Sequence, residues 1–141
     1  MYAVHCESYT EARAHLKDLL DAAGQGRVAT VRRDDEYAAV VDAERLRCAL
    51  TELCAAARVV AENGGWSVFL PGVPISADGA TFDEAVDEMI IALREYADDW
   101  QSRLRVAPNH QENWGLVQLI GLSDAAQLCD WLVGTHDGMA K

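Results

Sequence analysis

Cysteine and histidine side chains can bind a metal ion or act as nucleophiles, and in this sequence neither type is grouped. There is no Cys-x-x-Cys pair, and Cys48 and Cys54 lie six residues apart, a poor spacing for a shared metal ion. The full set is Cys6, Cys48, Cys54, Cys129, His5, His15, His110 and His136. We therefore expect small buried thiols in a reducing compartment and predict no metal site.

The carboxylates do not form a catalytic set either. A metal-dependent nuclease needs several carboxylates that converge on a divalent cation. The expected strands contain almost none, since Glu62 lies at a turn and Asp78 stands alone. A glycine-rich phosphate loop, a Ser/His/Asp set and an H-E-x-x-H motif are also missing from the sequence. We predict that the chain is not an enzyme and needs no cofactor.

Length and composition favour a globular protein. The chain has 141 residues, enough for one ordinary domain or two small ones, and half of them are hydrophobic. No apolar run approaches the roughly 20 residues that would span a bilayer. The first residues, MYAVHCESYTEAR, lack the basic and apolar regions of a signal peptide. We expect a cytoplasmic protein with no membrane partner.

The net charge of −11 is distributed unevenly along the chain. Residues 1–60 carry eight basic and ten acidic side chains, whereas residues 61–141 carry four basic and thirteen acidic ones. An acidic chain is a poor general DNA binder, because phosphate contacts dominate affinity for DNA. The acidic second half nevertheless leaves room for a basic patch in the first half, and it suits a basic protein partner.

Residues 8–50 predict a helix, two strands and a second helix. Ser8 and Glu11 form a capping box at the start of the first helix, and Gly24 and Gly26 end it. Apolar residues recur at helical spacing in this helix: Tyr9, Ala12, Leu16, Leu19, Leu20 and Ala23. A segment this short buries little surface, so we expect it to pair with a second copy.

Two short strands are expected at 27–32 and 37–41, joined by the acidic turn Asp34-Asp35-Glu36. The second helix begins near Asp42, a plausible N-cap residue. Its apolar stripe is Leu46, Ala49, Leu50 and Leu53.

These pieces resemble the N-terminal domain of the Phd/YefM family of antitoxins. The matching sequence segments are the helix opening S-Y-T-E-A-R-x-x-L, the strands V-A-T-V-R-R and A-A-V-V-D, and the following A-E-R-L. They occur in the right order and cover about the first third of the chain. The resemblance implies a dimeric fold that binds operator DNA, with a separate C-terminal part that neutralises a toxin.

The resemblance also implies DNA contacts for three arginines. Arg13 matches the arginine of the Y-x-E-A-R motif, and Arg32 and Arg33 match the arginines that close the first strand. A planar guanidinium suits this role because it binds a phosphate or a guanine edge with two hydrogen bonds. Thr10 and Lys17 are further candidates because they lie within about one turn of Arg13. The acidic turn departs from the family, whose members often have glycine or basic residues there.

The second part of the chain begins with a clear hairpin signal. Apolar segments at 58–62 and 66–70 flank the turn Asn63-Gly64-Gly65, and a third strand is expected at 75–77. Thr81 and Glu84 form a second capping box, which starts a long helix. Its expected buried face is Phe82, Ala85, Val86, Met89, Ile90, Leu93, Tyr96, Ala97 and Trp100.

After a polar loop at 106–113, residues 114–121 (WGLVQLIG) predict a fourth strand, and Ser123 is expected to cap a final helix. The order of three strands, a helix and a strand resembles the HicB-like antitoxin domain, a truncated relative of the RNase H fold. The sequence segments that support this resemblance are G-G-W-S-V-F-L-P-G-V-P and A-D-G-A-T-F-D-E-A-V-D-E-M, within residues 58–121.

We therefore predict an α+β protein with two domains. Residues 1–56 would form a Phd/YefM-like domain for dimerisation and DNA binding, and residues 57–141 a HicB-like βββαβ domain with a C-terminal helix, which binds the toxin. The outer face of the 82–104 helix is either a solvated surface or a docking surface for a cationic toxin. The candidate contact residues are Asp87, Glu88, Glu95, Asp98 and Trp114, the last because a tryptophan can anchor an interface.

These observations predict the antitoxin of a type II toxin–antitoxin module, which blocks its toxin by direct binding and represses its own operon. The HicB likeness implies a HicA-like ribonuclease toxin, and the Phd/YefM likeness a RelE-like ribonuclease or a Doc-like enzyme. The protein is expected to be a homodimer or a larger oligomer. Two alternatives remain, a stand-alone dimeric transcriptional regulator and an enzyme of unrecognised type.

Overall fold

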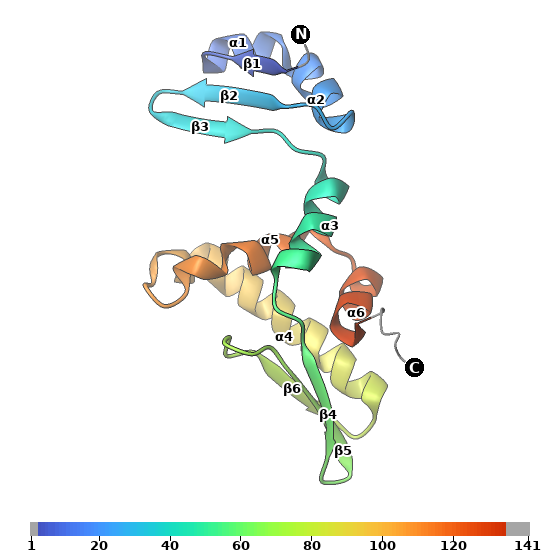
Figure 1. The fold of residues 1–141 in the computed structure, drawn as a ribbon. Helices are drawn as coiled ribbons and strands as arrows, with labels where there is room; N and C mark the ends of the chain where they lie inside the picture. Colours follow the sequence, from blue (N-terminus) through green and yellow to red (C-terminus); the bar gives the residue numbers. More distant parts are fainter. Residues whose placement is uncertain (1–2, 135–141) are drawn as a thin grey trace. The chain divides into compact units, whose positions relative to one another are not determined.

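The computed structural model describes residues 3–134, which form two three-stranded sheets and the helices around them (Figure 1). The chain divides into two compact units, Met1–Leu46 and Arg47–Lys141. This α+β content agrees with the prediction. His136 lies outside the described residues.

Unit 1 is a small sheet with two short helices. Its elements are β1 (Val4–Cys6), α1 (Tyr9–Ala14), α2 (Leu16–Gly24), β2 (Ala29–Arg33) and β3 (Glu36–Ala39). The predicted strands are confirmed with shifted ends, and they pair antiparallel so that Arg33 lies opposite Glu36. Strand β1 was not predicted, and it pairs in parallel with β2.

The expected first helix is present but divided at His15, whose backbone is not helical. The Ser8 hydroxyl accepts a hydrogen bond from the Glu11 N–H at 3.1 Å, as the capping box predicts. The Glu11 carboxylate, however, accepts from the N–H of Glu7 (2.7 Å), which differs from the expected return bond to Ser8.

The core of unit 1 is small and leaves much apolar surface exposed. Cys6, Leu19, Ala22 and Ala29 are buried together. The apolar stripe predicted for the first helix is only partly buried, because Leu19 and Ala23 are enclosed while others face outward. The large exposed apolar side chains of unit 1 are Tyr9, Leu16, Leu20, Val28, Tyr37 and Val41.

Helix α3 (Ala43–Leu53) begins in unit 1 and ends in unit 2. Asp42 acts as the predicted N-cap, since its carboxylate accepts from the Arg45 N–H at 3.1 Å. The expected apolar stripe is wrong in part: Leu50 is buried, but Leu53 is 80% exposed.

Unit 2 begins with the antiparallel sheet β4 (Arg58–Glu62), β5 (Gly65–Phe69) and β6 (Ser76–Gly79), in that order. The predicted hairpin is confirmed. Asn63 and Gly64 both have positive φ angles, 50° and 80°. A two-residue hairpin turn that matches the right-handed twist of its strands requires positive φ at both positions.

Helix α4 (Phe82–Ser102) packs on β5 and β6 (Figure 1). Its capping box is present, because the Thr81 hydroxyl accepts from the Glu84 N–H and the Glu84 carboxylate accepts from the Ala80 N–H. Most of the predicted buried face is confirmed: Ala85, Val86, Met89, Leu93, Ala97 and Trp100 are buried. Gly79 permits the close approach of β6 to α4, since a Cβ atom at this position would collide with the backbone at Ala85.

The predicted fourth strand is wrong. Residues Trp114–Leu122 form helix α5, so the βββαβ order is not found among residues 3–134. Leu116, Val117, Leu119 and Ile120 are buried at helical spacing. The sequence favoured neither alternative decisively, because a short apolar run fits a buried strand and a buried helix equally well.

The predicted loop at 106–113 contains two short 3₁₀ turns, η1 (Leu104–Val106) and η2 (Gln111–Asn113). The final helix is present as α6 (Ala125–Val133), but its cap is Asp124 and not Ser123. The buried Ser123 hydroxyl donates instead to the Leu119 carbonyl at the end of α5 (2.6 Å). Within the described part of the chain, no helix combines the length and apolar character needed to cross a bilayer.

Candidate functional sites

Two of the candidate DNA-binding arginines meet over one aromatic ring in unit 1. The guanidinium carbon of Arg13, on α1, lies 5.8 Å from the centre of the Tyr9 ring, and that of Arg33, at the end of β2, lies 5.7 Å from it. Both distances are within the range of a cation–π contact. The exposed Tyr9 ring therefore brings together two cations that are far apart in the sequence. From the sequence, Tyr9 was predicted only as part of the apolar stripe of the first helix.

Arg32 has different neighbours from Arg33, because successive residues of a strand point to opposite faces. Its guanidinium carbon lies 5.1 Å from the centre of the Tyr37 ring, and Tyr37 is its partner in the β2–β3 pair. Its Nε is also 3.6 Å from a carboxylate oxygen of Glu7. Part of its charge is thus balanced within the unit.

A surface hollow of about 500 Å³ lies beside Tyr9, Arg32 and Arg33. It is lined by Glu7, Ser8, Tyr9, Thr10, Arg32, Arg33 and Asp34. The candidates Thr10, Arg32 and Arg33 thus share one site. Two carboxylates share it as well, and they oppose phosphate binding there.

Lys17 does not line that hollow. It lies on α2, and its ammonium group is 2.7 Å from the Asp21 carboxylate. The hydrogen bond and the charge of Asp21 raise the pKa of Lys17, so the amine stays protonated. The ion pair is exposed, and such pairs contribute little to stability.

The acidic candidates of unit 2 lie together on the solvent side of α4. Asp87, Glu88, Glu95 and Asp98 are all exposed, as predicted. Their spacing places them along one stripe of the helix, around the exposed apolar residue Ile91. We call these four carboxylates the acidic stripe.

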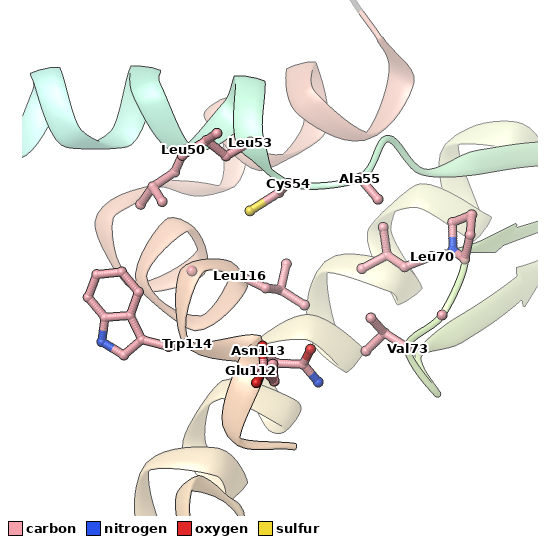
Figure 2. Close-up of a pocket in the computed structure, with 13 residues that line it drawn as sticks. Leu50, Leu53, Cys54, Ala55, Leu70, Val73, Glu112, Asn113, Trp114 and Leu116 are labelled. Atoms are coloured by element: carbon pink, nitrogen blue, oxygen red, sulfur yellow. The ribbon is translucent and has the colours of Figure 1, made fainter. Parts of the chain in front are cut away.

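Trp114 is 51% exposed, and it borders an apolar groove of about 470 Å³ in unit 2 (Figure 2). The groove lies between the end of α3, the β5–β6 connection and the start of α5. It is lined by Leu50, Leu53, Cys54, Ala55, Leu70, Pro71, Gly72, Val73, Glu112, Asn113, Trp114, Gly115 and Leu116. Burial raises the pKa of the Cys54 thiol. Sequence analysis missed this groove.

Hydrogen bonds to α4 hold the segment that precedes Trp114. The Asn113 side-chain N–H donates to the Tyr96 hydroxyl oxygen, and that oxygen lies 2.8 Å from Nδ1 of His110. The Trp100 indole N–H donates to the His110 carbonyl at 2.8 Å. Among residues 3–134, no group of three or more His, Cys, Asp or Glu side chains is placed to hold a metal ion.

Comparison with solved structures finds a similar chain. It is a crystal structure from Syntrophomonas wolfei subsp. wolfei, described as the antitoxin part of a candidate toxin/antitoxin system, with a TM-score of 0.74. The two chains share one fold. The match covers 94% of this chain and 96% of the other at 18% sequence identity, so the likeness extends over both units. No protein-family profile matches the chain, and no similar sequence is found among curated proteins.

Proposed function

We propose that this protein is the antitoxin of a type II toxin–antitoxin module. The observation that carries the proposal is the likeness to an antitoxin structure, which extends over 94% of the chain. The Phd/YefM-like words of unit 1 support the same role from the sequence. The antitoxin acts by covering its toxin, and its own side chains perform no chemistry.

Unit 2 is the proposed toxin-binding part. Residues 47–141 carry six basic and fourteen acidic side chains, a net charge of −8. A ribonuclease that binds the phosphates of RNA needs basic side chains, as nucleic-acid-binding proteins generally do. Charge complementarity between such a toxin and this unit would speed their association. We therefore propose a basic HicA-like or RelE-like ribonuclease as the partner.

Unit 1 is the proposed dimerisation and operator-binding part. Its exposed apolar side chains, among them Leu16, Leu20 and Val28, provide surface that a second copy can bury. A two-fold dimer would present two copies of the Tyr9 arginine pair to a palindromic operator. Binding there would repress the operon that encodes both proteins.

Co-expression with the product of the adjacent gene tests the antitoxin role. Expression of that product alone should arrest growth, and co-expression of the full chain should restore growth and yield a complex that co-purifies. Continued arrest in the presence of the folded chain, with no complex recovered, would refute the proposal. Operator binding without any toxin partner would favour the stand-alone regulator.

A further inference from the structure

We propose that the apolar groove beside Trp114 is the anchor site for an apolar side chain of the cationic toxin. This inference rests on the proposed function and names the part of unit 2 that supplies most of the binding energy. The toxin segment that enters the groove would carry a large apolar side chain flanked by lysine or arginine.

The groove has the geometry of an anchor site. Its floor is formed by buried side chains, including Leu50, Leu70 and Leu116, and its edges by the exposed Leu53 and Trp114 (Figure 2). Its volume of about 470 Å³ lies within the range of pockets that hold small ligands, about 300–1,000 Å³. Energetically important interface contacts typically place an aromatic or aliphatic side chain in a desolvated pocket of this kind.

The groove is also held in place before any partner arrives. The Asn113–Tyr96–His110 contacts fix the chain that leads into α5. The guanidinium of Arg94 donates to the carbonyls of Ile120 and Ser123 and so ties the other end of α5 to α4. A site that is already ordered loses less conformational entropy when it binds.

Charge identifies the occupant as a cationic protein. Glu112 is the charged residue among those that line the groove, and it lies next to the apolar surface. A second copy of this chain would bring two units of charge −8 together, which opposes self-association at this face. A basic protein gains from the same charge, and Glu112 can pair with a cationic residue beside the anchor.

Substitutions at the exposed edges of the groove test the inference in the full-length protein. Leu53→Glu changes a side chain that is 80% exposed, so folding should be unaffected. Trp114→Ala removes the opposite edge. Val106→Glu is the matched control, because Val106 is also highly exposed (70%) but lies on η1, outside both the groove and the acidic stripe. Affinity is measured by surface plasmon resonance against the purified product of the adjacent gene, and urea unfolding confirms that each variant is folded.

Leu53→Glu and Trp114→Ala should each weaken binding by about 30-fold or more, mostly through faster dissociation. Val106→Glu should stay within about threefold of wild type. If the wild-type chain binds and both groove variants bind equally well, the groove inference is refuted while the antitoxin role stands. If the wild-type chain does not bind, the proposed function fails first. Toxin affinity that is unchanged while Leu53→Glu alters the sedimentation of the free protein would assign the groove to self-association.

Discussion

Arg94 is expected to stabilise unit 2 by joining two of its helices. Its Nη1 donates to the Ile120 carbonyl at 2.7 Å and its Nη2 to the Ser123 carbonyl at 2.9 Å. Carbonyls at the end of a helix have no donor within that helix, and a cation there also interacts favourably with the helix dipole. Arg94→Met removes both hydrogen bonds and keeps a long apolar stem.

The size of the effect follows from these contacts. A hydrogen bond from a charged donor contributes about 1.5–3 kcal/mol to stability. The two bonds share one partly buried side chain, and water can reach part of the site after substitution. We therefore expect Arg94→Met to lower the free energy of unfolding by about 2–4 kcal/mol. Arg94→Lys should lose about half as much, because an ammonium group keeps the charge but not the planar fork.

Tryptophan fluorescence during a urea titration measures this loss in the appropriate unit. All four tryptophans, Trp66, Trp100, Trp114 and Trp131, belong to the unit that contains Arg94. With an m value of about 2 kcal/mol/M, the midpoint for Arg94→Met should fall by about 1–2 M.

Arg103→Met is the matched control at the C-cap of the same helix. Arg103 pairs with Asp99 at 2.8 Å, but its side chain is 67% exposed. Such a pair is worth about 0.5 kcal/mol or less, so this variant should unfold almost as wild type does. Equal midpoints for the two methionine variants would show that the Arg94 bonds do not stabilise unit 2.

Three further predictions concern the proposed interfaces. Arg13→Ala combined with Arg33→Ala removes four cations from a dimer, so the slope of log affinity for operator DNA against log salt should become shallower by about 3–4. Tyr9→Leu should weaken operator binding while Tyr9→Phe preserves it, and an unchanged leucine variant would contradict the positioning role of the ring. At pH 8, Cys54 should react with iodoacetamide more slowly than the exposed Cys48, because burial raises the pKa of Cys54 and lowers its thiolate fraction. The rate of Cys54 alkylation should keep rising as the pH increases. Of these two thiols, bound toxin should protect Cys54 alone. Equal protection of Cys54 and Cys48 would argue against occupation of the groove.

The elements that sequence analysis predicted correctly are those whose signals are local. The capping residues Ser8, Thr81 and Asp42 each lie within three residues of the N–H that they accept from. The Asn63-Gly64 turn likewise depends on backbone angles that these two residue types tolerate. Such signals need no knowledge of the rest of the chain, which is why the helix starts and the hairpin could be found.

The elements that could not be predicted from the sequence depend on distant partners. Strand β1 has only three residues, and it exists because it pairs with β2 more than twenty residues away. The run W-G-L-V-Q-L-I-G-L is apolar on all sides, so its periodicity could not distinguish a helix from a strand. The hydrogen bonds from Arg94 that end α5 come from a residue outside this run. The Tyr9 arginine pair and the apolar groove were missed for the same reason.

Residues 114–122 form a helix and not the predicted strand, and this difference alters the physical account of toxin binding. From the sequence, Trp114 and the acidic stripe were both predicted to contact the toxin. In the structure, Trp114 belongs to an apolar groove, whereas the acidic stripe surrounds Ile91 on α4. An apolar contact in a groove mainly slows dissociation, while exposed charges mainly speed association and lose their effect as salt screens them. The two surfaces can therefore be separated by kinetics: neutralising Glu88 and Glu95 should reduce the association rate at low salt, and substitutions at the groove should act at any salt concentration.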